Sequence, residues 1–217
     1  MRGKIVRDPD TPARENDEIC VDGKIVKASE FVYFMMNKPR GYVTTASDEK
    51  GRATVMDLFR EQYAKMFPNK PVPHISPVGR LDAASEGLLL FTNDTQWADA
   101  LLVSRDPVQH TKIYRVQVAG MPTAAELSQM EAGFFVPPRV FGEPEEFMHA
   151  VSAKLYSAGE KNCWLEITLD EGKNREIRRM LAKLGYEVLR LMRIKFCDYE
   201  LGGLKQGEIK KLNAPRT

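Results

Sequence analysis

The chain has 217 residues, of which 43% are hydrophobic and 29% are charged, and its formal net charge is +2. This length and composition predict a soluble globular protein with one large domain, or one domain and a small module, and argue against a disordered chain. The longest apolar run, residues 31–36, is much shorter than the roughly 18 residues that a transmembrane helix needs, so we expect no membrane span.

The N-terminus and the cysteines indicate a reducing compartment. The first ten residues, MRGKIVRDPD, contain no apolar signal segment. Cys20, Cys163 and Cys197 are far apart and odd in number, and the three histidines lack the spacing of metal ligands. The sequence therefore predicts a cytoplasmic protein with neither disulfides nor a structural zinc.

Residues 1–28 form a short first segment in which GKIV, at residues 3–6, recurs at residues 23–26. A polar stretch with two prolines separates the two copies, so we expect short hairpin strands joined by turns. Twenty-eight residues cannot bury a core of their own, and the segment is either a fragment of a larger module or an appendage.

From residue 29 onward, strand-like and helix-like apolar patterns interleave without a strict βαβ rhythm. Apolar or alternating runs predict strands at residues 31–36, 42–45, 88–91, 112–118, 163–169 and 188–196. Helical spacing predicts helices at residues 54–67, 95–103, 123–132 and 176–184, and residues 134–147 read as an irregular loop. These patterns predict an α+β fold with a mixed, mostly antiparallel sheet flanked by helices.

Residues 77–94, PVGRLDAASEGLLLFTND, place one acid, Asp82, two positions after Arg80 and just before a buried strand. In most proteins such an acid belongs to a turn or an ordinary ion pair. A carboxylate beside a guanidinium at the mouth of a strand is also an arrangement that serves catalysis, so Asp82 is a candidate site residue.

Three other stretches carry candidate functional residues. In residues 171–180, EGKNREIRRM, the arginines at 175, 178 and 179 form a basic stripe along a helix, which either binds phosphates or is a solvated face. Residues 171–195 hold eight Lys or Arg and three Glu, a net charge of +5, which resembles an electrostatic footprint for a polyanion.

The remaining two stretches have an ordinary and a functional interpretation. Tyr114 shares a strand face with valines and is either a core tyrosine or a ring that stacks on a nucleobase. In residues 37–41, NKPRG, Lys38 and Arg40 flank a proline turn that either holds a phosphate or is a surface turn. Phosphate-binding loops, dinucleotide fingerprints and zinc-protease or serine-hydrolase motifs are missing, which leaves a nucleophilic carboxylate as the candidate chemistry.

Four stretches together resemble the RsuA-type ribosomal RNA pseudouridine synthases. They are MNKPRGYVTT, PVGRLDAASEGLLLFTND, TKIYRVQVAG and DEGKNREIRRM, they follow that family's order, and the resemblance covers residues 29–217. The string GRLD followed by GLLL-x-T-x-D is far more specific than a lone glycine motif. The similarity of NKPRG and PVGRLD favours the large-subunit branch of the family.

The resemblance implies a pseudouridine-synthase-like sheet with a central RNA-binding cleft and a cofactor-free isomerisation of uridine. It implies that Asp82 is the nucleophile, attacking either the ribose anomeric carbon or the uracil ring, and that Tyr114 stacks on the flipped base. It further implies that Arg178 pairs with the nucleophile and that Arg80 orders the cleft. We expect RNA contacts from Lys38, Arg40, Lys112, Lys173, Asn174, Arg175 and Arg179.

The expected partner is ribosomal RNA, of the large subunit or of its assembly intermediate, and we expect a monomer without membrane contact. One departure concerns residues 1–28, which resemble only the C-terminal hairpin of the family's N-terminal RNA-binding module. Two alternatives stay open: a non-catalytic RNA-binding assembly factor, and a carboxylate glycosidase with Glu86 as the second acid.

Overall fold

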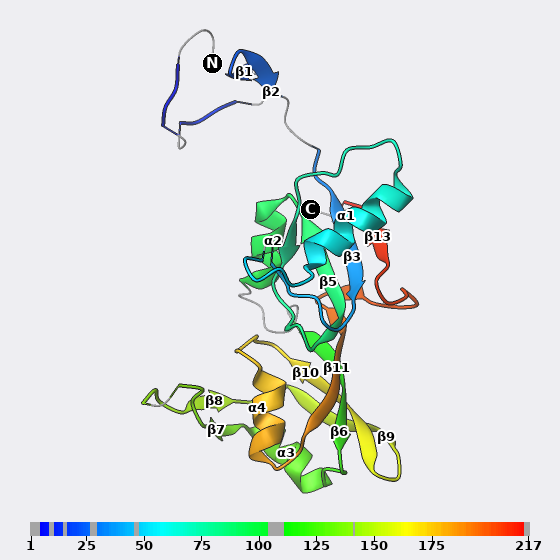
Figure 1. Cartoon of the computed structure of the whole chain (residues 1–217). Helices are drawn as coiled ribbons and strands as arrows, with labels where there is room; N and C mark the ends of the chain where they lie inside the picture. Colours follow the sequence, from blue (N-terminus) through cyan, green and yellow to red (C-terminus); the bar gives the residue numbers. More distant parts are fainter. Residues whose placement is uncertain are drawn as a thin grey trace. The chain divides into compact units, whose positions relative to one another are not determined.

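The computed structural model describes residues 5–8, 11–14, 17–26, 30–45, 48–103, 111–140 and 142–214. The chain divides into two compact units, Met1–Phe31 and Val32–Thr217, which are described separately here (Figure 1). The boundary lies near the expected one after residue 28. That the first unit is part of an RNA-binding module stays a prediction.

The first unit contains one antiparallel hairpin, β1 (Ile19–Val21) and β2 (Lys24–Val26). Asp22 and Gly23 form its two-residue turn with φ of 51° and 73°, the left-handed backbone that tight hairpins require. The predicted hairpin is thus present around the second GKIV. The first copy lies partly outside the described residues, and Ile5 and Val6 belong to no strand.

The second unit is built on a nine-stranded sheet, which confirms the predicted α+β fold. Its main path runs β13-β3-β5-β11-β6-β10-β9, with β12 paired to β11 and β4 paired to β5. Every pairing is antiparallel except that of β5 with β11, so the sheet is mixed. The strands are β3 (Tyr33–Lys38), β4 (Ser76–Val78), β5 (Glu86–Thr92), β6 (Lys112–Ala119), β9 (Ser152–Ala158), β10 (Asn162–Leu169), β11 (Val188–Phe196), β12 (Tyr199–Glu200) and β13 (Ile209–Lys211).

In the described part of this unit, four helices flank the sheet, all within two residues of their predicted bounds: α1 (Val55–Met66), α2 (Thr95–Leu102), α3 (Ala124–Ala132) and α4 (Glu176–Lys183). Local chemistry explains their ends. Thr54 and Thr123 each form a capping box, Asp94 caps α2, and Gly133 ends α3 with φ of 81°. In the described part of the chain, no helix is long and apolar enough to cross a membrane.

The core lies on both faces of β5, whose seven residues are all buried. On one face, Phe59 of α1 stacks on Phe91 at 5.1 Å and meets Phe34 of β3 edge-on. On the other face, Leu88 and Leu90 pack with a smaller cluster beside α2. α3 and α4 cover the other end of the sheet, near β6 and β10 (Figure 1).

The structure differs from the predicted elements at three longer segments, and the short strands β4, β12 and β13 also lack a predicted counterpart. The strand predicted at residues 42–45 is wrong: Val43 makes only a single bridge with Thr54, which ties this segment to the start of α1. The loop predicted at residues 134–147 begins and ends in a small hairpin, β7 (Phe134–Val136) and β8 (Glu146–Met148). The strand β9 has no predicted counterpart, because five of its seven residues are exposed and leave no alternating pattern.

Candidate active site

Asp82 lies in the loop that joins β4 to β5, and the backbone of this loop is fixed from several sides. Gly41 N–H donates to the Ala83 carbonyl at 2.7 Å, and the Thr44 hydroxyl donates to the Leu81 carbonyl at 2.7 Å. Ser85 N–H closes a turn on the Asp82 carbonyl at 2.9 Å. Asp82 therefore sits on a rigid support, as a reacting group requires.

Lys38, at the end of β3, lies beneath this loop and is fully buried. Its ammonium donates to the carbonyls of Asp82 (3.1 Å), Ser85 (2.8 Å) and Pro39 (3.1 Å). Burial lowers the pKa of Lys38 to about 8, and the negative charges of Asp82 and Glu86 oppose that shift. The expectation that Lys38 contacts RNA needs correction, because a buried ammonium with three carbonyl partners cannot reach a phosphate.

Lys38→Met should lower the free energy of unfolding by about 2–3 kcal/mol, because it leaves three buried carbonyls without their donor. The matched control, Lys65→Met, changes a lysine whose side chain is 64% exposed and should cost less than about 0.5 kcal/mol. Urea denaturation of both variants measures the difference. Equal losses would mean that Lys38 does not hold the Asp82 loop.

The Asp82 carboxylate forms an ion pair with Arg175, whose Nη1 lies 3.2 Å from Oδ2. Arg175 immediately precedes α4 and has φ of 51°, a left-handed conformation that is uncommon for arginine. The side chains of Asp82 and Arg175 are 39% and 41% exposed, so the pair is open to a ligand. Among the described residues, this ion pair is the direct contact between the basic segment and Asp82.

Arg178, the expected partner of Asp82, instead binds two backbone carbonyls. It donates to Val188 at 3.1 Å and to Ala84 at 3.3 Å, and thereby connects α4 to β11 and to the Asp82 loop. Burial and the charge of Arg175 lower the pKa of Arg178, whereas the nearby Asp82 carboxylate raises it. Arg178 is thus close to Asp82 but is not its ion-pair partner in this structure.

Tyr114 projects from β6 into the wall of the same site and is buried. Burial raises the pKa of Tyr114, and Arg193, its register partner on β11, opposes that rise. The Arg193 side chain is buried, with Nε donating to the Leu88 carbonyl at 2.8 Å and Nη2 lacking a partner among the described residues.

The side chains of Asp82, Tyr114, Arg175, Arg178 and Arg193 line one cavity, which has a volume of about 800 Å³. Of the eleven residues predicted to form the site, eight line it: Arg80, Asp82, Lys112, Tyr114, Lys173, Asn174, Arg175 and Arg178. Arg80 is exposed, and no hydrogen bond or ion pair to a described residue holds its guanidinium. The cavity thus joins an acid, an aromatic ring and several cations from different parts of the chain.

The other side chains predicted to contact RNA differ in how many partners they already have within the protein. Arg179 is bound to Glu146 and to the Pro137 carbonyl, so its charge is already neutralised within the protein and the expected phosphate contact does not fit. Lys173 pairs with Glu171 at 2.6 Å, and Asn174 accepts a bond from Arg139 at 2.7 Å. Arg40 is exposed, and its guanidinium makes a long contact, 3.5 Å, to the Leu189 carbonyl.

Glu86, the second acid of the glycosidase alternative, is held by hydrogen bonds within the protein. Both of its carboxylate oxygens bind Arg190, at 2.9 and 3.0 Å, and Gln206 adds a third bond at 3.2 Å. The residue is buried. Among the described residues, no group of three or more His, Cys, Asp or Glu side chains is placed to hold a metal ion.

Arg193 and Glu176 are among the cavity-wall residues that sequence analysis did not identify. Arg193 occupies a position in β11 whose strand partners, Tyr114 and Gly87, are buried. A charged residue on the buried face of a strand is a signal that could have revealed it. Glu176 was hidden because it stands among cations at the start of an amphipathic helix.

Comparison with known proteins identifies the family to which this site belongs. The profile described as RNA pseudouridylate synthase matches residues 32–183. Ribosomal large subunit pseudouridine synthase B of Bacillus subtilis (strain 168) is 35% identical over 215 residues, which cover 98% of this chain and 80% of that protein. Ribosomal large subunit pseudouridine synthase E of Vibrio vulnificus (strain CMCP6) is 31% identical over 210 residues, covering 93% of this chain and 83% of that protein.

A solved structure described as a crystal structure of pseudouridylate synthase agrees with the fold. Its TM-score is 0.67 at 28% sequence identity, over 97% of this chain and 83% of that one. Both comparisons confirm the resemblance to the RsuA type that the four motifs indicate. This chain therefore belongs to the RNA pseudouridylate synthase family and is an isomerase that acts on RNA.

Proposed function

We propose that this enzyme converts a uridine of ribosomal RNA to pseudouridine and that Asp82 is the nucleophile. The observation that carries the proposal is the Asp82–Arg175 ion pair at 3.2 Å, in a cavity that also holds Tyr114. Attack requires a carboxylate oxygen in a fixed position, and the adjacent guanidinium orients that oxygen through a charge-assisted hydrogen bond.

The isomerisation needs no co-reactant, because uridine and pseudouridine have the same composition. The bond between N1 of uracil and the ribose breaks, a bond from C5 to the ribose forms, C5 loses a proton and N1 gains one. Asp82 attacks the anomeric carbon of the ribose or the uracil ring, and both routes use the same carboxylate. The walls of the cavity keep the detached base beside the ribose until it has turned.

The environment of Tyr114 favours a stacking role in the resting enzyme. Because burial raises the pKa of Tyr114, the phenol is neutral at physiological pH, and this largely buried side chain lines the cavity. A stacked ring offsets part of the cost of extracting the uridine from its helix, which is a few kcal/mol. Arg193, facing Tyr114, eases later removal of the phenol proton by stabilising its anion.

The cations at the rim supply the contacts to the RNA backbone. Arg80 and Arg40 are exposed, and Arg175 is partly exposed, so these three are the best placed to meet phosphates. Lys112 lies deeper, where burial lowers its pKa and its ammonium donates to the Glu171 carbonyl at 3.2 Å. This gradient from exposed to buried cations suits an RNA strand that inserts one nucleotide.

The relatives at 35% and 31% identity are both named large-subunit enzymes, so we propose large-subunit ribosomal RNA or its assembly intermediate as the substrate. The test incubates the purified protein with unmodified large- and small-subunit RNA and maps pseudouridine by carbodiimide adducts that stop reverse transcriptase. One new stop in large-subunit RNA is the expected result. A protein that yields no stop on RNA or on partly assembled subunits would be a binder rather than this enzyme.

Arg175→Gln tests which arginine serves Asp82. We expect it to lower the single-turnover rate by about 10- to 100-fold, because the carboxylate loses its charge-assisted partner. Arg60→Gln is the control, since Arg60 pairs with Asp57 on α1 and is 53% exposed. Wild-type turnover by Arg175→Gln would show that the observed ion pair has no part in the reaction.

A further inference from the structure

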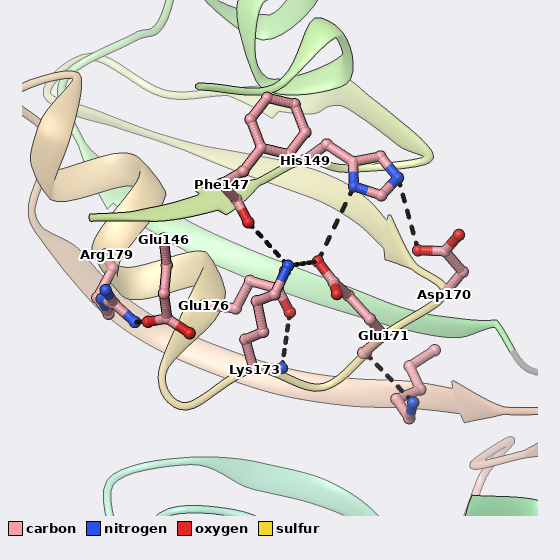
Figure 2. Close-up of polar contacts among 9 residues, drawn as sticks. Glu146, Phe147, His149, Asp170, Glu171, Lys173, Glu176 and Arg179 are labelled. Carbon is pink, nitrogen blue, oxygen red and sulfur yellow. Dashed lines mark hydrogen bonds and ion pairs between the residues drawn. The ribbon is translucent and has the colours of Figure 1, made fainter. Parts of the chain in front are cut away.

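The loop that carries Arg175, residues 171–176, is held by a group of carboxyl and cationic side chains (Figure 2), of which Glu171, Lys173 and Glu176 also line the cavity. Lys173 lies at the centre of this group: its ammonium binds Glu171 Oε1 at 2.6 Å and the Phe147 carbonyl at 2.7 Å. The Glu171 carbonyl accepts a bond from Lys112 at 3.2 Å. The loop is therefore anchored to β8 and to β6 through charged groups.

Glu176 completes this arrangement from the first position of α4. Its Oε2 accepts a bond from the Lys173 backbone N–H at 3.1 Å, which folds the loop back onto the helix (Figure 2). The residue is 3% exposed, and its Oε1 is buried without a hydrogen-bond partner in the described structure. A buried carboxylate oxygen without a donor is unstable when ionised, and a proton on that oxygen removes the cost.

We propose that Glu176 is a positioning residue that carries a proton in the active enzyme, and that loss of this proton displaces the 171–176 loop and withdraws Arg175 from Asp82. This inference rests on the proposed function only in the role it gives to Asp82. Glu176 itself is one residue away from Arg175 and touches the loop rather than the carboxylate.

The groups that face Glu176 from its neighbouring elements decide the direction of the effect. Burial, and then the neighbouring Glu171, raise the pKa of Glu176 to about 8 against the opposing effects of the Lys173 backbone N–H and the Lys173 charge. Burial also acts to raise the pKa of Glu171, but its neighbours Glu176 and Lys173 outweigh burial and lower it. One proton therefore stays on Glu176 while Glu171 is ionised.

The charge of Glu176 also affects the pKa values of two side chains on β6, Lys112 and Tyr114. Ionised Glu176 raises the pKa values of Lys112 and Tyr114, although burial is the largest influence on both and acts in opposite directions on them. His149 lies near the other side of Glu171, at 3.9 Å, and 3.7 Å from Asp170. Above pH 8, two adjacent carboxylates repel each other, and the nearest cation, Lys173, is already bound to Glu171.

The first test compares single-turnover rates at pH 7 and pH 9 within each variant. For the wild type we expect the rate at pH 9 to be about tenfold lower than at pH 7, since a group with pKa near 8 is roughly nine-tenths ionised at pH 9. In Glu176→Gln, which cannot ionise at this position, the pH 9 to pH 7 ratio should be about tenfold higher than in the wild type, and any fall that remains is assigned to Lys38, whose pKa is also about 8. Glu61→Gln, an exposed glutamate on α1, should show the wild-type ratio and controls for titration of the RNA.

The second test does not depend on turnover. Limited trypsin digestion at pH 7 and pH 9 should show faster cleavage after Lys173 and Arg175 at pH 9 in the wild type, relative to cleavage after exposed Lys65. Glu176→Gln should lack this increase. If the wild type shows no turnover at any pH, the proposed function fails and the digestion alone decides the inference.

A merely structural role for Glu176 would lower activity or stability without changing the pH ratio. Equal pH ratios for wild type and Glu176→Gln, or identical digestion at both pH values in the wild type, would overturn the inference. Because the digestion needs only the wild-type protein, it also decides the question if Glu176→Gln does not fold.

Discussion

Asp82→Asn is expected to abolish formation of pseudouridine while the protein stays folded. The amide is isosteric with the carboxylate but is not a nucleophile under these conditions, so we expect the single-turnover rate to fall by at least about 1000-fold. The fold should persist because the loop is held through the Asp82 backbone carbonyl, which accepts bonds from Lys38 and Ser85. Its carboxylate contributes only a partly exposed ion pair, worth about 0–1 kcal/mol.

The measurement is the carbodiimide assay on the RNA that the wild type modifies, together with urea denaturation of the variant. Asp99→Asn is the control, because Asp99 is an exposed acid on α2 and does not line the cavity. Turnover by Asp82→Asn close to that of the wild type would remove Asp82 from the nucleophile role. An unfolded variant would instead show that the Asp82–Arg175 pair holds the loop.

The pairing of Asp82 with Arg175 shows where sequence patterns stop being informative. Three arginines at 175, 178 and 179 lie on one face if the helix includes all of them, and nothing in that spacing distinguishes their partners. In the structure, α4 begins at Glu176, the residue after Arg175. The left-handed backbone of Arg175 therefore places its side chain off the helical face that carries Arg178 and Arg179. The three side chains then go to Asp82, to two carbonyls and to Glu146.

Lys38 illustrates a second limit: its residue type and its place in a proline turn indicate an exposed side chain, but the side chain is buried. A lysine in a proline turn is normally solvated, and only the end of β3 beneath the Asp82 loop gives it three carbonyl partners. Such an environment comes from strands that are far apart in sequence. Local patterns predicted α1, β6 and β11 well, because each of these elements buries a regular stripe.

The longer elements that sequence analysis missed bury too few side chains to leave a periodic pattern. β9 has mostly exposed side chains and is held by its ladder of bonds to β10, and the short strands β7 and β8 bury Val136 and Met148 but expose Phe135 and Phe147. Backbone pairing leaves no periodic trace in the sequence. No local sequence pattern predicts the cavity either, because its walls come from separate parts of the chain: the Asp82 loop, β6, β11 and the segment before α4.

Gly87→Ala is expected to be the most destabilising single substitution near the site. Gly87, in β5, has φ of +102° and faces Arg193 across the parallel pairing of β5 with β11. A Cβ atom at this position would lie 2.3 Å from the Arg193 carbonyl oxygen and 2.8 Å from its nitrogen. Backbone strain and the clash together should lower the free energy of unfolding by about 3–5 kcal/mol.

Gly185→Ala separates the two contributions. Gly185 follows α4 with φ of +87°, and a Cβ atom there would meet nothing within 4 Å, so only backbone strain of about 1 kcal/mol applies. Urea denaturation of both variants gives the comparison, and the excess loss in Gly87→Ala measures the close approach of β5 to β11. Since Arg193 faces Tyr114 from this same position of β11, the excess should be accompanied by slower turnover. A loss no larger than that of Gly185→Ala would mean that the two strands can separate without cost, and that their contact does not fix the cavity wall.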